Sequence, residues 1–378
     1  MRVVHVGKFY PPEYLGGLES VVVGINDELV RRGIGVTAVV ASAGGPGGRD
    51  TWRGVDVIRA PTLATVLSQP IAPGFGRAVR EAAGDLLHLH HPNPLGDVAV
   101  LPDRRPLVIT QHSEIVRQRV LAPLYLPLLR RALERARFVA IGSEQLLGTS
   151  RELRGFEDRT RVVPFGIDAS RFASSAAVAG RAAELRSRWG GRPVVLAVGR
   201  LVAYKGFDVL LRATRDLEAT VVIVGAGPEE APLRALAGSN VVMAGRLSEA
   251  DLVAHYHACD VFCLPSVTIA EAFGMVLLEA MACGKPLVTT SLPTGVSAVN
   301  REGRTGLVVP PGDAGALREA LRALLNDPAR ARAMGEAGRA VQAAEYGVTL
   351  MAERYLTLYR DALAPAGRDG GRRARAGS

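Results

Sequence analysis

Cysteine and aromatic residues are scarce in this chain. Three cysteines occur among 378 residues, at Cys259, Cys263 and Cys283, and all three lie within apolar runs. An odd number without a framework spacing excludes a disulfide scaffold and predicts reduced, buried thiols in a reducing compartment. Aromatic residues make up 5% of the chain, which argues against a base-stacking surface for nucleic acid.

Long apolar runs and closely spaced acids are also missing. The sequence has no run of about 18 uncharged apolar residues, so we expect no transmembrane helix. The opening segment Met1–Val6 predicts a strand and lacks the apolar stretch of a secretion signal, so we expect a cytoplasmic protein. No Asp-x-Asp occurs anywhere, which removes a common acidic clamp for a divalent metal.

Positive charge, by contrast, is abundant, with a formal net charge of +9. A positive net charge of this size is typical of proteins that bind nucleic acid, anionic lipid or an acidic substrate. Part of the excess comes from arginines that stand among glycines near the end of the chain. This composition predicts a disordered basic tail over residues 365–378.

Apolar runs alternate with helical periodicity twice along the chain. The first series begins with Val3–Val6 and the helical stretch Leu18–Arg32, and the second begins at Val194–Val198. This alternation predicts an α/β fold of two Rossmann-like, doubly wound domains that face each other across a cleft. We place an N-terminal domain at 1–167, a connector at 168–192, a C-terminal domain at 193–349 and a helix at 350–364 that could cross back to the first domain.

Ligands of such sheets bind where strands end and helices begin. Gly16 and Gly17 stand at the start of the first helix, where paired glycines let a backbone approach a ligand and free N–H groups suit phosphate. A simple turn is the alternative. Gly199, Arg200 and Lys205 follow the first strand of the second series, and two cations there suit a diphosphate. A solvated surface pair is the alternative.

The segment from Pro265 to Pro286 carries the most specific pattern. Its loop holds Glu271, and its helix begins near Gly274 and holds Glu279. Carboxylate oxygens accept hydrogen bonds from sugar hydroxyls, and N–H groups at a helix start favour anions. A solvent-facing position is the alternative for Glu279, although its neighbours are apolar or small.

Histidines need separate treatment. His112 follows the predicted strand Leu107–Thr110, which is a favourable position for a functional residue. We assign four others to structure, because two lack enough neighbouring ligands for zinc and two diverge on a helix. These four are His88, His90, His255 and His257.

The stretch Arg117–Arg137 interleaves arginines with leucines, which suits a helix on an anionic lipid surface. Pro123 and Pro127 are expected to disturb a single helix there. A buried segment between the domains is the alternative.

Taken together, the motifs resemble those of retaining glycosyltransferases of family 4, which have the GT-B fold. The resemblance covers about residues 1–360. It rests on Gly16-Gly17-x-Glu19, Val163–Asp168, Gly199-Arg200 with Lys205-Gly206, and Glu271 with Glu279. The segments His90–Pro94 and Gln111–Gln118 are similar to those of bacterial mannosyltransferases that assemble surface polysaccharides.

The resemblance implies a role for each motif. The diphosphate would meet Arg200 and Lys205, the ribose Glu279, and the donor sugar Glu271. The implied catalytic residues are His112, Glu271, Arg200 and Lys205. The implied donor-binding residues are Gly16, Gly17, Gly199, Arg200, Lys205, Arg246, Glu271, Phe273, Gly274, Met275 and Glu279.

The implied function is transfer of a hexose, with GDP-mannose as the expected donor, to a glycan, lipid-linked or small-molecule acceptor. We expect no metal and no cofactor beyond the nucleotide sugar, a peripheral position at the inner face of the plasma membrane, and no specific nucleic acid. A sugar-nucleotide epimerase of the same fold and a non-enzymatic nucleic-acid or anion binder stay open. Glu271→Ala or Lys205→Ala is expected to abolish transfer and to leave the fold intact.

Overall fold

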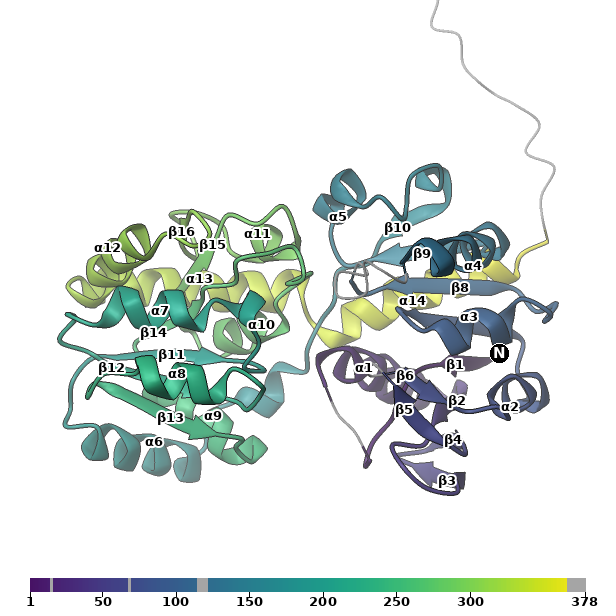
Figure 1. Cartoon of the computed structure of the whole chain (residues 1–378), viewed down its shortest axis with the longest axis horizontal. Helices are drawn as coiled ribbons and strands as arrows, with labels where there is room; N and C mark the ends of the chain where they lie inside the picture. The colour runs from purple at the N-terminus through teal and green to yellow at the C-terminus, as the bar shows by residue number, and fades with distance from the viewer. Residues whose placement is uncertain (14–15, 67–68, 114–121, 366–378) are drawn as a thin grey trace, which may run out of the picture.

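The chain forms two lobes, each built on its own sheet (Figure 1). The computed structural model describes residues 1–13, 16–66, 69–113 and 122–365. The expected basic tail at 365–378 lies outside these residues apart from its first position.

The N-terminal lobe holds, within the described residues, an eight-stranded sheet in the order β10-β9-β8-β7-β1-β2-β4-β3. Every neighbouring pair is parallel except the edge pair β3–β4. Its strands are β1 Arg2–Val6, β2 Gly35–Ala41, β3 Gly48–Trp52, β4 Val55–Ala60, β7 Leu86–His91, β8 Leu107–Gln111, β9 Phe138–Ile141 and β10 Thr160–Val162, beside a hairpin of β5 Ala64–Val66 and β6 Gln69–Ile71. Its helices are α1 Gly17–Arg31, α2 Phe75–Glu81, α3 Pro94–Val100, α4 Ala122–Arg135 and α5 Glu144–Thr149.

The C-terminal lobe holds a parallel sheet in the order β13-β12-β11-β14-β15-β16. Its strands are β11 Val194–Val198, β12 Thr220–Val224, β13 Val241–Gly245, β14 Val261–Leu264, β15 Leu287–Thr290 and β16 Gly306–Val309. Its helices are α6 Ala176–Arg188, α7 Phe207–Thr214, α8 Glu230–Leu236, α9 Glu249–Ala258, α10 Met275–Ala282, α11 Gly295–Val299, α12 Ala314–Leu325 and α13 Pro328–Glu345, and α14 Val348–Leu363 follows.

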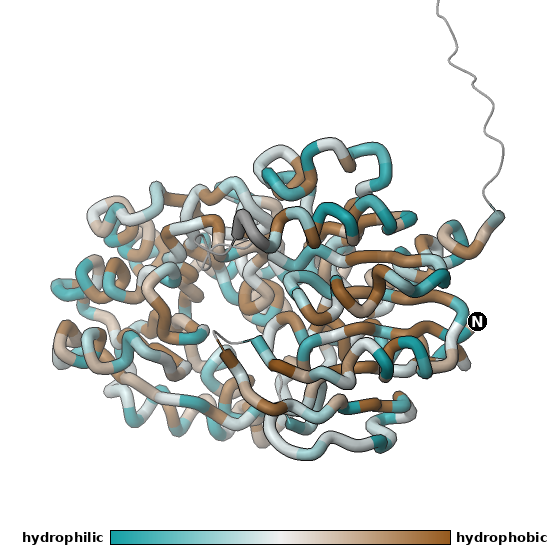
Figure 2. Tube along the Cα trace, turned by 45° about the vertical axis from the view of Figure 1, so that its right-hand side comes forward, coloured by the Kyte–Doolittle hydropathy of each residue, from teal (hydrophilic) through white to brown (hydrophobic). Residues whose placement is uncertain are grey.

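Both faces of each sheet are buried, which is why the central strands are apolar at nearly every position. Val3 and Val4 illustrate this, since neighbouring residues of one strand enter different core clusters. One cluster continues from lobe to lobe through Phe165 and Phe273. Figure 2 shows hydrophobic segments along the elements of both lobes.

The chain passes between the lobes at two places that lie side by side. The Ile167 N–H donates to Tyr346 O at 3.0 Å, and the Val348 N–H donates to Ile167 O at 3.0 Å. A Cβ at Gly166 would stand 2.6 Å from Gly347 O, so only glycine permits this approach. We call these paired crossings the hinge. Beyond it, α14 packs against α1, β7 and β8 of the N-terminal lobe (Figure 1).

Three sequence expectations can be compared with these elements. All three cysteines are free and buried, as predicted. The expectation that Pro127 would disturb a helix is wrong, because α4 continues through it. In the described part of the chain, no helix combines the length and apolar character that crossing a membrane requires.

Candidate donor site between the lobes

The predicted site residues gather at the switch point of each sheet. In the C-terminal sheet, β11 and β14 are neighbours although two strands, β12 and β13, lie between them in the chain. In the N-terminal sheet β1 and β7 are neighbours although β2 to β6 lie between them in the chain. Loops after such strands diverge and leave a crevice in which ligands of open α/β sheets bind.

A buried ion pair joins the loops that follow β11 and β14. Lys205 Nζ donates to Glu271 Oε2 at 2.5 Å, and Ser266 Oγ donates to the same oxygen at 3.0 Å. The two charged side chains are only 10% and 9% exposed. Burial lowers the pKa of Lys205, but the attraction of Glu271 outweighs it and the net shift is upward.

Two glycines make this pair possible. A Cβ at Gly206, which has a φ of +66°, would lie 2.2 Å from Pro265 O. A Cβ at Gly199 would stand 3.4 Å from Lys205 Nζ. The close approach of the two loops therefore requires glycine at position 206, and glycine at position 199 leaves room for the end of the Lys205 side chain. Removing one charge leaves its buried partner unpaired, which argues against the expectation that Lys205→Ala keeps the fold intact.

Arg200 differs from Lys205, because it is exposed and forms no ion pair with any described residue. Lys8, which follows β1 in the opposite lobe, lies close enough to Arg200 for the two positive charges to repel each other. Burial lowers the pKa of Lys8, Glu19 raises it, and the positive charge of Arg200 lowers it further. Two cations from different lobes thus converge on one region, where an anion would relieve their repulsion.

Lys8 was missed by the sequence reasoning, although a signal for it exists. The chain has 46 basic residues, of which only Lys8, Lys205 and Lys285 are lysines. In a chain this biased towards arginine, a lysine directly after a switch-point strand marks a position where a compact point charge is used.

Gly16 and Gly17 stand at the start of α1 as predicted, with Gly16 as its N-cap. The Gly16 N–H donates to Glu19 Oε2 at 3.1 Å, so the helix start is partly capped by its own carboxylate. A Cβ at Gly17 would meet nothing within 4 Å, so packing alone does not require glycine there. Tyr14 and Leu15, which precede the pair, lie outside the described residues.

Glu279 is the fifth residue of α10 and is only partly exposed. Burial raises the pKa of Glu279 to about 7, although a hydrogen bond donated by Tyr256 at 2.6 Å works in the opposite direction. Gly274, with a φ of +78°, caps the helix without a side chain, so the N–H groups of the first turn are not used by a capping side chain. Phe273 is buried and Met275 partly buried beside this turn.

His112 approaches this loop from the N-terminal lobe through two aromatic rings. It stacks on Phe165 with 5.0 Å between ring centroids, and Phe165 contacts Phe273 at 4.9 Å. Gly142 lets these rings meet, since a Cβ there would stand 2.9 Å from both. His112 is therefore placed between the two switch points. Arg246 is exposed directly after β13, two strands away from β11, and is not drawn into this cluster.

The histidines assigned to structure divide into two pairs. His255 and His257 each bond a backbone carbonyl, of Asp251 at 2.7 Å and Phe172 at 2.9 Å. His88 and His90 meet a third imidazole, His5 of β1, and nitrogens of the three lie within 4.8 Å of one another. This trio could be considered for a metal, but both nitrogens of His88 already bond hydroxyl groups and both nitrogens of His90 bond imidazoles.

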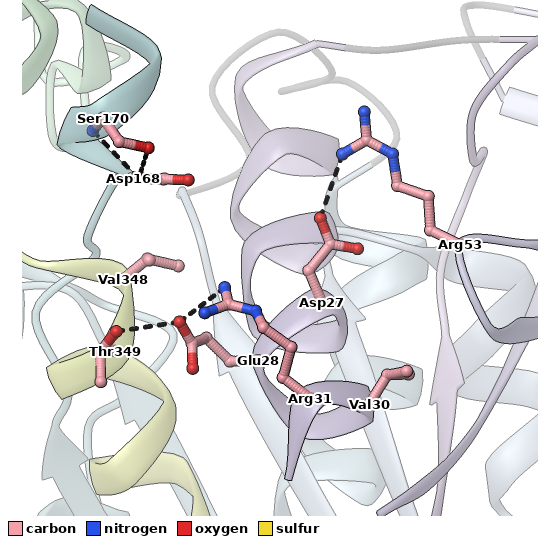
Figure 3. A pocket seen from close by; sticks show the side chains of 9 residues that line it. All are labelled: Asp27, Glu28, Val30, Arg31, Arg53, Asp168, Ser170, Val348 and Thr349. Carbon is pink, nitrogen blue, oxygen red and sulfur yellow. Dashed lines mark hydrogen bonds and ion pairs between the residues drawn. The ribbon is translucent and has the colours of Figure 1, made fainter. Parts of the chain in front are cut away.

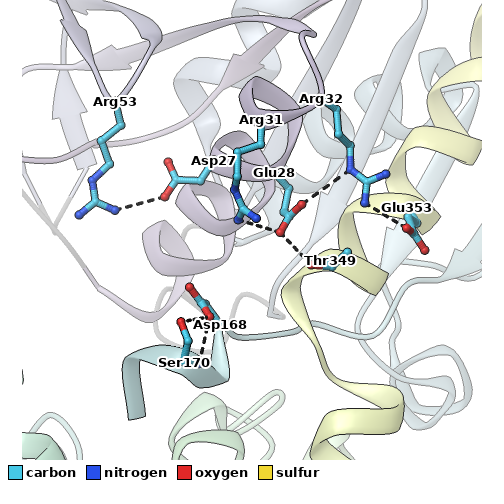
Figure 4. A network of polar contacts seen from close by, with 9 residues as sticks. All are labelled: Asp27, Glu28, Arg31, Arg32, Arg53, Asp168, Ser170, Thr349 and Glu353. Carbon is cyan, nitrogen blue, oxygen red and sulfur yellow. Dashed lines mark hydrogen bonds and ion pairs between the residues drawn. The ribbon is translucent and has the colours of Figure 1, made fainter. Parts of the chain in front are cut away.

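A separate cavity of about 490 Å³ lies beside the hinge (Figure 3). Its charged side chains already have partners: Arg53 donates to Asp27 at 3.2 Å, Arg31 lies 2.7 Å from Glu28, and Asp168 accepts from Ser170 Oγ at 2.6 Å (Figure 4). Glu28 also accepts from Thr349 Oγ1 at 2.9 Å. The bond between Glu28 and Thr349 ties α1 to the start of α14. None of the predicted site residues lines this cavity; its lining is Asp27, Glu28, Val30, Arg31, Arg53, Asp168, Ser170, Val348 and Thr349.

The chain is similar to known proteins over nearly its whole length. Residues 186–341 match the family model described as glycosyl transferases group 1, and residues 15–171 match glycosyltransferase family 4. The chain is 32% identical over 368 residues to O-antigen chain mannosyltransferase C of Escherichia coli, covering 95% of this chain and 98% of that one. It is 35% identical over 332 residues to D-rhamnosyltransferase WbpZ of Pseudomonas aeruginosa, covering 86% of each.

A solved structure of sucrose-phosphate synthase from Thermosynechococcus elongatus superimposes with a TM-score of 0.78 and 23% identity, covering 95% of this chain and 98% of that one. The fold of the two lobes is therefore shared with this protein although fewer than a quarter of the aligned residues are identical.

Proposed function

The chain belongs to glycosyltransferase family 4 and has the GT-B fold, and from this premise we propose that it transfers a hexose with retention from GDP-mannose to a glycan or lipid-linked acceptor. The observation that carries the proposal is the similarity over 95% of the chain to a protein named as an O-antigen chain mannosyltransferase. The second relative is named for D-rhamnose, which is mannose without the oxygen at C6. The two sugars share the remaining arrangement of hydroxyls.

The charges of the site support departure of a diphosphate without a metal ion. Breaking the bond between sugar and phosphate builds negative charge on the leaving group. Arg200 is exposed and unpaired among the described residues, and Lys8 lies near it. The first turn of α10 adds the partial positive charge of its N–H groups. These groups would stabilise the departing diphosphate while Glu271 contacts the sugar.

In the proposed step, the acceptor hydroxyl attacks the anomeric carbon from the face that the phosphate leaves. The bond from that carbon to the phosphate oxygen breaks as the bond to the acceptor oxygen forms. The leaving phosphate oxygen takes the proton of the acceptor hydroxyl, so no protein nucleophile is required. Closing the lobes on the donor would exclude water from the reacting atoms.

The experiment is a donor panel with product analysis. Full-length protein is incubated with GDP-mannose, GDP-D-rhamnose, UDP-glucose and ADP-glucose in the presence of a mannose-terminated glycan. We expect transfer from a GDP sugar of manno configuration and an α-linked product by NMR. Preference for UDP-glucose, or a product of inverted configuration, would contradict the proposal. Donor conversion without any acceptor would favour the epimerase, and salt-sensitive RNA binding without transfer would favour the non-enzymatic alternative.

We also propose that the protein works at the inner face of the plasma membrane in the cytoplasm. Support comes from α4, where Leu126 is 43% exposed beside the exposed Arg130 and Arg131. Residues 117–121 of the predicted lipid-binding stretch lie outside the described residues. Vesicles with anionic headgroups should co-sediment the protein, while zwitterionic vesicles should not. Equal recovery with both, or none with either, would remove this proposal.

A further inference from the structure

Three imidazoles form one hydrogen-bonded line across the N-terminal sheet. His5 Nδ1 lies 2.9 Å from His90 Nε2, and His90 Nδ1 lies 3.0 Å from His112 Nε2. The strands explain this alignment, because β1, β7 and β8 are direct neighbours and His5 stands opposite His88, two residues before His90. The line therefore runs from the buried middle of the sheet to its carboxyl edge.

All three rings are buried, which favours their uncharged form. His5 and His90 are 1% exposed and His112 is 8% exposed. Burial lowers the pKa of His5 and of His112 to about 3, and it lowers the pKa of His90 well below its usual value. A neutral imidazole has one N–H and one lone pair. Each ring must therefore donate to one neighbour and accept from the other, so the whole line points in a single direction.

The two possible directions differ at their ends. If the line points inward, the final N–H sits on His5 Nε2, which is buried and has no hydrogen-bond partner. If it points outward, His5 Nε2 keeps a lone pair, and the final N–H sits on His112 Nδ1. Among buried backbone groups of proteins, an N–H without an acceptor is rarer than an acceptor without a donor, and we apply the same order to these imidazoles. The outward direction is therefore favoured.

From this geometry, and building on the proposed function, we propose that His5 and His90 are positioning residues that hold His112 as the Nδ1–H tautomer. The stacking of His112 on Phe165 fixes the plane of its ring, and the imidazole line fixes which nitrogen carries the proton. His112 then donates a neutral hydrogen bond towards the space between the switch points. The acceptor of this hydrogen bond is a hydroxyl oxygen of the donor sugar. A neutral N–H suits this place, because it adds no charge beside the electron-poor anomeric carbon.

The neighbouring His88 provides a matched comparison. It lies on the same strand and the same face as His90 and is fully buried. Its hydrogen bonds go elsewhere, to Tyr359 OH and Thr110 Oγ1, each at 2.7 Å. His88→Leu therefore removes a buried imidazole from the same core without interrupting the line, whereas His90→Leu interrupts it.

The first test is made on the unaltered full-length chain. With only seven histidines, long-range ¹H–¹⁵N spectra of protein labelled at histidine report the tautomer of each ring. We expect a neutral His112 with its proton on Nδ1. A proton on Nε2, or a charged ring at pH 7, would overturn the proposal. This readout does not depend on transfer, so an inactive protein with the expected tautomer would count against the proposed function and leave the imidazole line standing.

The second test uses variants and the donor assay. His90→Leu should give a mixed His112 tautomer and lower kcat by about tenfold, the value of one hydrogen bond, with little change in the KM of the acceptor. His90→Asn, whose amide can donate from the position of Nδ1, should restore the tautomer and most of kcat. His88→Leu should leave both unchanged even if the melting temperature falls. Equal loss of kcat in His88→Leu and His90→Leu would show that both histidines serve packing alone, and would refute the proposal.

Discussion

The buried pair of Lys205 and Glu271 allows stability and activity to be separated. Removing one partner of such a pair strands a charge in a poorly solvated place, which costs about 3–5 kcal/mol. With roughly 2–4 °C of melting temperature per kcal/mol, Lys205→Ala and Glu271→Gln should each lower the transition of the C-terminal lobe by on the order of 10 °C. The double variant Lys205→Met with Glu271→Leu removes both charges and should recover most of this loss. The hydroxyl of Ser266 then lacks its acceptor, which leaves a deficit of about 1 kcal/mol.

Calorimetry and the donor assay should be run on the original chain, on these three variants and on one control. All three variants should lose transfer, because the pair stands at the switch point, whereas only the single variants should lose much stability. Arg212→Ala, which breaks an exposed pair with Asp208, is the control and should change stability by less than about 1 kcal/mol. Single variants as stable as the original chain, or a double variant that is less stable than both, would refute the reasoning about burial.

Three further predictions concern the groups around the pair. Because the pKa of Glu279 is raised to about 7, its ionised form gains population as the pH rises through 7, and the donor affinity measured by calorimetric titration should increase from pH 6 to pH 8. In Glu279→Gln the affinity should not change with pH. In Tyr256→Phe the midpoint of the pH dependence should shift upward. Arg200→Ala should weaken donor binding at least tenfold and raise the pKa of Lys8, since a repelling charge is lost. NMR of methylated lysines measures this pKa directly in a chain with three lysines. An unchanged pKa of Lys8 would show that the two cations lie apart. Gly166→Ala pushes a Cβ to 2.6 Å from Gly347 O, so it should reduce donor-induced compaction in small-angle scattering, while Gly180→Ala, which meets nothing within 4 Å, should not.

The sequence was sufficient for most of the parallel strands, because buried parallel strands are apolar at nearly every position and such runs are easily recognised. It also located the loops after β11 and β14, since ligands of these sheets bind beside strand ends. It missed the exposed edge strand β3, whose residues Gly48–Trp52 lack an apolar pattern. It also did not predict β4, β16 or α13. It also misjudged Pro127, which α4 accommodates.

Contacts between residues that are distant in the chain could not be predicted from the sequence. Lys205 and Glu271 are 66 positions apart, and their pairing depends on β11 lying beside β14. His90 was assigned to structure from its position on a strand face, but its bond to His112 becomes visible only when β7 and β8 are adjacent. Strand order decides both contacts, and short apolar runs do not encode that order.

The central claim is that side-chain cations, rather than a divalent ion, receive the charge of the departing diphosphate. The most direct measurement is the initial rate of transfer from GDP-mannose after extensive chelation with EDTA, with and without added manganese. We expect an undiminished rate in EDTA and a rate that collapses when Arg200 is replaced by alanine. A rate that vanishes in EDTA and returns with manganese would contradict the claim.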